Sequence, residues 1–273
     1  MAAPAATAVA TSASGRRQRG RAIPPDSNGD PLKIAVLSDV HGNLPALTAV
    51  LEDVDAAGPD RVWCLGDLVG YGAHPDGCVQ TARERCAVNL AGNHDLGVLD
   101  HIDIADFAPH AEQAARWTRE NASEETLRYL ETLSPKHEGE AIGLFHASPR
   151  DPIWEYVLSG KQAAECMDFM EPRVSAIGHT HVASYFSRTD GAMAGGTAGA
   201  GTELNIEAGE WLLNPGSVGQ PRDGDPRAAW LLLDVEQWTA TWRRTEYPVD
   251  DAAAAIEAAG LPTGLGERLY LGQ

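Results

Sequence analysis

The sequence lacks the long apolar run, the basic surplus and the cysteine pairs that would indicate several common protein classes. No segment approaches the ~18 apolar residues of a membrane span, so no membrane association is expected. Lys and Arg number 21 against 39 Asp and Glu, a formal net charge of −18, which argues against an extended nucleic-acid surface. The four cysteines form no C-x-x-C pair, which favours free thiols in the cytoplasm over a zinc ribbon or disulfides.

The chain divides by composition into a tail and a body. Residues 1–32 are rich in Ala, Ser, Pro and Gly, and contain four arginines but no aromatic residue. Such a segment cannot bury enough apolar surface to fold, so we predict a disordered N-terminal tail. Its paired arginines are followed by no apolar stretch, which excludes a secretory signal of that type. We expect one domain over 33–248, with a C-terminal helix and tail over 249–273 packed on it.

The body alternates between short apolar runs and segments with helical spacing. Strands are expected at 33–38, 61–65 and 86–90, and helices at 45–57 and 76–85. This alternation is the signature of a layered α/β fold with a largely parallel sheet.

The alternation breaks at residues 100–134, where two helical patterns follow each other. Ser123 is placed as the N-cap of the second helix, and Pro135 follows its end. Later strands are expected at 142–145, 174–177, 183–186 and 211–213, with a hairpin at 228–233 and 238–243. The glycine-rich stretch 191–202 is expected to be a flexible hairpin loop. Trp63 is expected in the core. Tyr71, Trp117 and Trp154 are candidates to line a cleft, but core or interhelical packing is favoured for Trp117 and Trp154.

Five of the expected strands end in Asp, His or Asn. The side chains delivered there are Asp39, His41, Asp67, Asn93, His146, His179 and His181. Because the carboxyl ends of strands in open α/β sheets meet at a binding crevice, we expect these side chains to converge. Seven such groups suit two divalent ions that share one carboxylate. Four imidazoles favour Mn, Fe or Zn over Mg or Ca, and two dications with two carboxylates leave about +2, which attracts a phosphoric ester.

The order of these motifs resembles the calcineurin-like metallophosphoesterase superfamily over about residues 33–245. The motifs are D-x-H (39–41), G-D (66–67), G-N-H-D (92–95), H (146) and G-H-x-H (178–181). The segment N-P-G-S (214–217) is similar to the compact bacterial phosphodiesterase branch. The resemblance implies a layered αββα sandwich, with helices on both outer faces and a metal site at the carboxyl ends of the strands.

The resemblance also implies a role for each motif residue. It assigns Asp39, His41 and His181 to one metal and Asp67 to a bridging position. The second metal would be held by Asn93, His146 and His179. His94 matches the family's catalytic histidine, and Asp95 is placed to orient its ring.

These roles imply hydrolysis of a phosphoester by a hydroxide that bridges two divalent metals, with Mn favoured and Fe or Zn possible as alternatives. His94 would protonate the leaving group or stabilise the equatorial oxygens. Phosphoprotein phosphatases of the family carry clamping arginines after the G-D and N-H motifs, but here Gly70 and Tyr71 follow the first motif. Their absence favours a phosphodiester substrate. Arg150 and Tyr71 are candidate substrate contacts, although Arg150 fits an exposed turn equally well.

Other functions stay open at this point. A phosphomonoesterase, including a phosphoprotein phosphatase, or a dinucleoside-polyphosphate hydrolase would use the same site. A non-catalytic metal-binding scaffold is disfavoured, because all seven ligand positions and His94 are present. The expected partner is a small phosphoester, and residues 100–134 are placed to cover the site and set specificity.

Overall fold

The computed structural model describes residues 32–137 and 141–273. The expected disordered tail therefore lies outside the described residues, except for Leu32 at its end. Leu32 is 3% exposed, and its carbonyl accepts a hydrogen bond from the amide of Val235 at 3.1 Å. Leu32 therefore belongs to the folded body and not to the tail.

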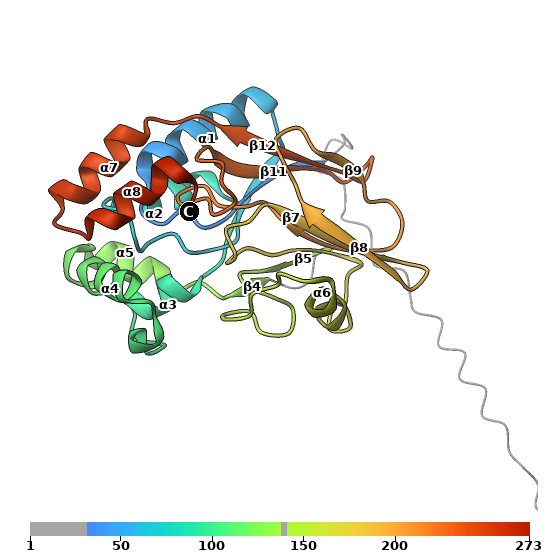
Figure 1. Ribbon diagram of the computed structural model, residues 1–273, viewed down its shortest axis with the longest axis horizontal. Coiled ribbons are helices and arrows are strands. Elements are labelled where there is room, and N and C mark those ends of the chain that lie inside the picture. The colour runs from blue at the N-terminus through green and yellow to red at the C-terminus, as the bar shows by residue number, and fades with distance from the viewer. Residues whose placement is uncertain (1–31, 138–140) are drawn as a thin grey trace, which may run out of the picture.

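Two six-stranded sheets lie face to face (Figure 1). The first has the order β3-β2-β1-β11-β12-β9. Its strands are β1 (Lys33–Leu37), β2 (Arg61–Cys64), β3 (Val88–Asn89), β9 (Glu203–Asn205), β11 (Ala228–Asp234) and β12 (Thr239–Thr245). The second has the order β4-β5-β6-β10-β7-β8. Its strands are β4 (Lys136–His137), β5 (Ile142–Phe145), β6 (Val174–Ala176), β7 (Ser184–Thr189), β8 (Ala192–Thr197) and β10 (Glu210–Asn214).

Helices cover the outer faces of both sheets (Figure 1). Those on the side of the first sheet are α1 (Leu44–Ala57), α2 (Pro75–Arg85), α4 (Pro109–Asn121), α5 (Glu124–Leu130), α7 (Val249–Ala258) and α8 (Thr263–Leu271). A single helix, α6 (Gly160–Met167), packs on the second sheet. Two short elements, α3 (Asn93–Val98) and the 3₁₀ turn η1 (Ile104–Asp106), lie between β3 and α4.

The alternation of side chains along β1 explains the layers. Ile34 and Val36 point between the two sheets, where they join residues of both sheets in one core. Ala35 and Leu37 point the other way and pack against the helices of the first sheet. Because neighbouring residues of a strand face opposite sides, a fully apolar strand requires cover on both faces. The expected αββα sandwich is confirmed, and Trp63, which is 1% exposed, lies in the core between the sheets.

The helix limits follow from their capping residues. Asn43 accepts a hydrogen bond from the amide of Ala46 at 3.1 Å and starts α1, with Pro45 in the first turn. Ser123 accepts from the amide of Thr126 at 3.2 Å and starts α5, as predicted. Each cap satisfies one of the free amides of a first helical turn.

Two expectations about the sheets are wrong. The sheets are mixed, because β1 pairs with β2 in parallel but with β11 in antiparallel orientation. The glycine-rich stretch is an ordered strand over much of its length: β8 pairs with β7 from Ala192 to Thr197. A two-residue turn at Asp190 and Gly191, both at positive φ, joins the two strands and matches their twist.

The parallel strands bring their carboxyl ends to one place. In the first sheet these are β1, β2 and β3, and in the second β5, β6 and β10. Hydrogen bonds join the loops that follow them, such as the Asp39 amide to the Gly66 carbonyl at 3.0 Å and the Gly178 amide to the His146 carbonyl at 2.7 Å. Loops distant in the sequence therefore form a single edge.

Candidate metal centre

The loops at this edge hold their polar residues in left-handed backbone conformations. Nine non-glycine residues of the described chain have positive φ, and six of them meet at this edge: Asp39, His41, Asp67, Tyr71, His179 and His181. Such conformations cost roughly 1–3 kcal/mol each and persist only where the surroundings fix them. Main-chain bonds between the loops do so here, including the His41 amide to the Asp67 carbonyl at 2.8 Å. The cost is typical of a functional site.

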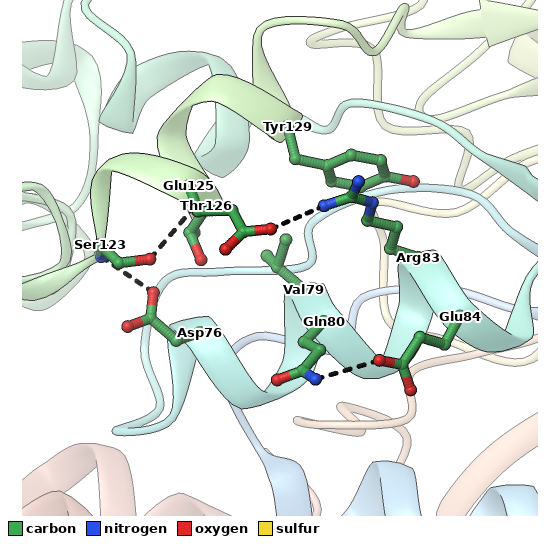
Figure 2. Close-up of a pocket in the computed structure, with 9 residues that line it drawn as sticks. All are labelled: Asp76, Val79, Gln80, Arg83, Glu84, Ser123, Glu125, Thr126 and Tyr129. Carbon is green, nitrogen blue, oxygen red and sulfur yellow. Dashed lines mark hydrogen bonds and ion pairs between the residues drawn. The ribbon is translucent and has the colours of Figure 1, made fainter.

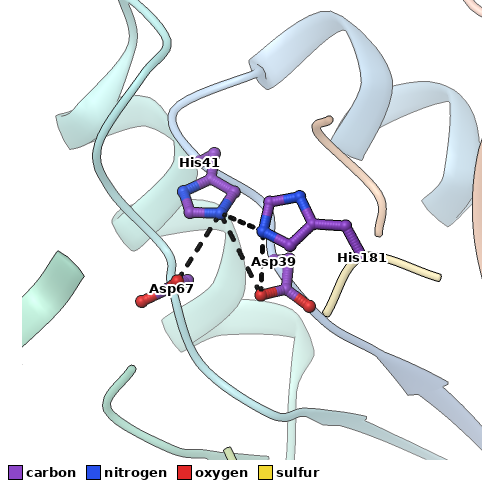
Figure 3. Close-up of side chains that lie close together, drawn as sticks. All are labelled: Asp39, His41, Asp67 and His181. Carbon is purple, nitrogen blue, oxygen red and sulfur yellow. Dashed lines mark hydrogen bonds and ion pairs between the residues drawn. The ribbon is translucent and has the colours of Figure 1, made fainter. Parts of the chain in front are cut away.

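A first cluster joins four of the predicted ligands: Asp39, His41, Asp67 and His181 (Figure 3). The Nε2 atoms of His41 and His181 are 3.0 Å apart. His41 Nε2 lies 3.5 Å from Asp67 Oδ2, and His181 Nε2 lies 3.5 Å from Asp39 Oδ1. None of the four residues is more than 1% exposed.

A second cluster joins Asp67, His146 and His179. His146 Nε2 lies 3.6 Å from Asp67 Oδ2 and 3.2 Å from Asn93 Oδ1. Asp67 thus belongs to both clusters, and its other oxygen, Oδ1, accepts the His94 amide at 2.8 Å. The structure brings all seven predicted ligands to one edge.

The far side of each imidazole is fixed by main-chain carbonyls. The Nδ1 atoms of His41, His146 and His181 lie 3.1, 3.0 and 2.6 Å from the carbonyl oxygens of Val69, Leu65 and Gln220. The ring of His179 bonds to the main chain of Trp154. A neutral imidazole that donates from Nδ1 has its lone pair on Nε2. Each of these three rings therefore directs a lone pair into the clusters.

This donor set fits divalent cations. With both Nδ1 protons on carbonyls, the facing Nε2 atoms of His41 and His181 are two acceptors and cannot bond each other. The same holds for His146 Nε2 and the amide oxygen of Asn93. Asp39 Oδ1 and His179 Nε2 are buried without any hydrogen-bond partner. Converging acceptors without donors are an arrangement that a bound cation satisfies.

Burial sets the charge state of these groups when no cation is present. It raises the pKa of Asp39 to about 7 and raises the pKa of Asp67 well above its usual range. Burial also lowers the pKa values of His41, His179 and His181 well below 6.5. The imidazoles are thus neutral and ready to coordinate, while the carboxylates lack the positive charge that would hold them ionised.

His94 is in the first turn of α3, beside the first cluster. Its ring centroid lies 4.8 Å from that of His41, 4.5 Å from that of Tyr71 and 4.9 Å from that of Phe107. Gly70 makes room for the ring, because a Cβ atom there would lie 2.4 Å from His94 Nδ1. Burial, and then the charge of Arg222, lower the pKa of His94 to about 3. The ring is therefore neutral in the cation-free protein.

Asp95 holds a loop rather than a ring. The sequence suggested that its carboxylate orients His94, but its oxygens accept the amides of Gly92, Leu68 and Val69 at 2.8, 3.2 and 3.1 Å. The Nδ1 atom of His94 has no partner. Asp95 thus ties the start of α3 to the loop that follows Asp67, and it acts on His94 through the main chain.

The two predicted substrate contacts have different surroundings. Tyr71 is 9% exposed, and its ring lies 4.6 Å from that of His41. Arg150 is paired with the carboxylates of Glu155 and Glu165. Its charge is thus already neutralised by the protein.

Aromatic residues surround the clusters, and of these the sequence had offered only Trp154 as a cleft residue, in second place to core packing, while Phe107 and Tyr156 were missed. The ring centroids of Tyr156 and His179 are 4.1 Å apart, and Phe107 contacts both His94 and Trp154. Trp154 and Tyr156 are 36% and 44% exposed, so packing in the core is the wrong role for Trp154. Trp117, in contrast, is partly buried and packs against the core between the first sheet and its helices. We call Phe107, Trp154 and Tyr156 the aromatic rim.

Arg222 was also missed. It lies in the loop after N-P-G-S, which Ser217 anchors to the site by donating to the main-chain oxygen of Asp39 at 2.8 Å. The Arg222 amide donates to the carbonyl of His181 at 3.1 Å. The only signal in the sequence was its position, five residues after Ser217.

A separate hollow of about 460 Å³ lies between α2 and α5 (Figure 2). Its lining includes Arg83, which pairs with Glu125 at 3.0 Å and lies 5.5 Å from the ring centroid of Tyr129. None of the seven predicted ligands lines it. A smaller cavity beside His41 and Tyr71 is also lined by Ile256 of α7 and Leu269 of α8.

Comparison with known proteins agrees with this geometry. The calcineurin-like phosphoesterase superfamily domain matches residues 32–237. An uncharacterized protein of Methanocaldococcus jannaschii is 36% identical over 247 residues, 88% of this chain and 98% of its own. The crystal structure of a metallophosphoesterase from Sphaerobacter thermophilus superposes with a TM-score of 0.82 at 37% identity, covering 89% of this chain and all of the other. A hypothetical protein from Pyrococcus horikoshii shares the fold, with a TM-score of 0.73, 20% identity, and 89% and 99% coverage.

The chain belongs to the calcineurin-like phosphoesterase superfamily and is a hydrolase of phosphoester bonds. The resemblance drawn from the five ordered motifs is confirmed. All four cysteines are free thiols. Across residues 32–137 and 141–273, every helix is too short or too polar to cross a membrane.

Proposed function

We propose that the protein is a two-metal phosphodiesterase. The observation that carries this proposal is the position of Asp67, whose Oδ2 atom faces His41 at 3.5 Å and His146 at 3.6 Å. One carboxylate oxygen between two groups of nitrogen ligands suits a pair of cations that share it. Asp39, His41 and His181 would hold one ion, and Asn93, His146 and His179 the other.

Manganese is the proposed metal, with iron or zinc as alternatives, because imidazole nitrogens and carboxylate oxygens are mixed in the site. Bound divalent cations supply Lewis acidity and lower the pKa of water, so that a nucleophile is available at neutral pH. The protein prepares for them by keeping His41, His179 and His181 neutral through burial. No proton then has to leave these rings when an ion binds.

His94 is the proposed catalytic residue. It is 4% exposed, and its neutral ring has one N–H group to donate to a phosphoryl or leaving-group oxygen. Its place is fixed through its amide, which donates to Asp67, and through Asp95, which holds the adjoining loop. A positioned donor or acid of this kind contributes roughly 10²–10⁴-fold to the rate.

The aromatic rim supports a diester substrate. A diester has ester groups on both sides of the phosphorus, and exposed aromatic side chains at the site offer them apolar contact. Phe107 lies between η1 and α4 and contacts His94 at 4.9 Å between ring centroids. This contact supports the proposal that residues 100–134 cover the site and set specificity. The free thiols support a reducing compartment, and we place the enzyme in the cytoplasm.

Rates on two model esters test the proposal. Protein loaded with Mn²⁺ is expected to hydrolyse bis-p-nitrophenyl phosphate faster than p-nitrophenyl phosphate, and a chelator should abolish both activities. A faster monoester rate would favour the phosphomonoesterase alternative. Faster hydrolysis of dinucleoside polyphosphates than of either ester would favour the dinucleoside-polyphosphate hydrolase alternative. Two bound ions with no activity on any ester would indicate a scaffold.

A further inference from the structure

Arg222 differs from most arginines of the structure because it has no carboxylate partner. Its Nη2 atom donates to the Tyr71 hydroxyl at 3.2 Å and to Gln220 Oε1 at 2.9 Å. Its Nε atom is buried without a partner. Within the described chain no Asp or Glu oxygen lies in ion-pair range of Arg222, whereas Arg150 and Arg244 each pair with acidic side chains.

Arg222 lies next to both the metal ligands and His94. Its amide donates to the carbonyl of the ligand His181 at 3.1 Å. Its guanidinium carbon lies 5.6 Å from the ring centroid of Tyr71, and that ring contacts the rings of His41 and His94 at 4.6 and 4.5 Å. One aromatic ring therefore separates the guanidinium from the predicted catalytic histidine.

The Arg222 side chain is partly buried, and its hydrogen bonds go to neutral oxygens of Tyr71 and Gln220. A partly buried cation without a counter-ion is costly, so such groups are normally paired. The carboxylates of Asp39 and Asp67 belong to the clusters instead, so an anion from outside the chain would supply the missing partner.

We propose that Arg222 binds the substrate's phosphoryl group directly. Its guanidinium would donate to a non-bridging phosphoryl oxygen, while Gln220 and the Tyr71 hydroxyl position it. This inference rests on the proposed phosphoesterase function of the site. It identifies Arg222 as the side chain that would bring a positive charge of the protein to the bound phosphoryl group. Arg222 thereby takes the role that the sequence offered to Arg150.

The reason is chemical complementarity. Guanidinium groups match the spacing of phosphate oxygens and form charge-assisted hydrogen bonds with them. The negative charge on these oxygens changes during the reaction. A donor that is already held in position stabilises the new charge distribution without having to move. The two neutral acceptors, Gln220 and Tyr71, hold the side chain without neutralising its charge.

The test uses inorganic phosphate as the probe and the Mn²⁺-loaded full chain. Isothermal titration is expected to show that Arg222→Gln weakens phosphate binding about tenfold or more, while Mn²⁺ stoichiometry and melting temperature stay at wild-type values. The kcat/KM for bis-p-nitrophenyl phosphate should fall about 100-fold. Arg222→Lys should recover part of both losses, because lysine keeps the charge but not the planar fork.

Two further variants sharpen the result. Arg227→Gln, in the same loop but paired with Asp225, is the matched control and should bind phosphate and turn over like the wild type. Tyr71→Phe, which removes one acceptor of Arg222, should weaken phosphate binding by less than Arg222→Gln.

An Arg222→Gln protein that keeps two ions and binds phosphate like the wild type would overturn the inference. If that variant fails to fold, Arg222→Lys decides: weaker phosphate binding supports the inference, and unchanged binding overturns it. A wild-type protein that binds phosphate through Arg222 but cleaves no ester would refute the proposed function and leave the inference standing. Loss of diesterase activity with unchanged phosphate affinity would refute direct binding.

Discussion

The floor and the rim of the site are built in opposite ways. The floor consists of the seven predicted ligands, which are buried and follow strand ends, six on loops and Asn93 at the start of α3. The Nδ1 atoms of His41, His146 and His181 lie against main-chain carbonyls. The rim, taken more widely, consists of Tyr71, Arg222 and the aromatic rim of Phe107, Trp154 and Tyr156. Trp154 and Tyr156 share one loop, and the other three residues each lie on a different one. Under the proposed function, the floor would perform the hydrolysis and the rim would select the ester.

The largest effect is expected for Asp67→Ala, which removes the residue shared by both clusters. At least one ion should be lost, and activity should fall by more than the roughly 100-fold typical of residues that only support a ligand. Metal analysis by mass spectrometry, with circular dichroism as the check on folding, measures this. Two full ions per chain in the variant would contradict the shared position.

His94→Ala comes next and separates chemistry from metal binding. Turnover should fall by about 10²–10⁴-fold, because under the proposed function the side chain would touch the reacting group without holding an ion. Metal content should remain that of the wild type. A variant that loses both ions would show that His94 is needed to hold the metal ligands in place.

A smaller effect is expected from pH, and it tests the electrostatics of the floor. Burial raises the pKa of Asp39 to about 7, so below this pH a proton occupies the carboxylate that an ion needs. Mn²⁺ affinity should therefore rise by at least about tenfold from pH 6 to pH 8 and then level off. Calorimetric titration of metal-free protein gives the curve. An affinity that is flat over this range would show that Asp39 is ionised before the metal binds.

The smallest effect is expected at Phe107 of the aromatic rim. Phe107→Ala should leave metal content unchanged and alter the ratio of rates on aryl and alkyl diesters by about tenfold or less, the value of one lost apolar contact. Arg83→Gln in the hollow between α2 and α5 is the matched control. Its pair with Glu125 is 54% and 75% exposed, so stability should change by no more than about 1 kcal/mol. Equal rate ratios in Phe107→Ala and the wild type would show that Phe107 does not contribute to substrate specificity.

The sequence predicted the floor better than the rim for a physical reason. Asp39 and His181 each follow an apolar run, so their place at a strand end was visible in the chain. Arg222 follows Gln220 and Pro221 in a loop without periodicity, and nothing in the sequence shows which way its side chain turns. Arg150 had the same residue type and a comparable place, but Glu155 and Glu165 take its charge.

The fold divides in a similar way. The layers followed from runs such as β1, whose residues must be covered on both faces. The antiparallel neighbour of β1 is β11, far along the chain, and a local pattern does not encode such a partner. β8 contains Gly195 and Gly196, so it lacks the alternating apolar side chains by which strands are predicted. β8 is held in the sheet by its pairing with β7 and by the turn at Gly191, because its own side chains have no alternating apolar pattern.

The positive φ angles at the ligand positions limit how this site can change. Asparagine, aspartate and histidine enter the left-handed region several-fold more readily than other L-residues, and branched side chains are nearly excluded from it. Among residues with a side-chain ligand atom, the backbone at Asp39, His41, Asp67, His179 and His181 therefore favours Asp, Asn and His. The backbone shape of these loops thus limits, together with side-chain chemistry, which metals a variant of this site could bind.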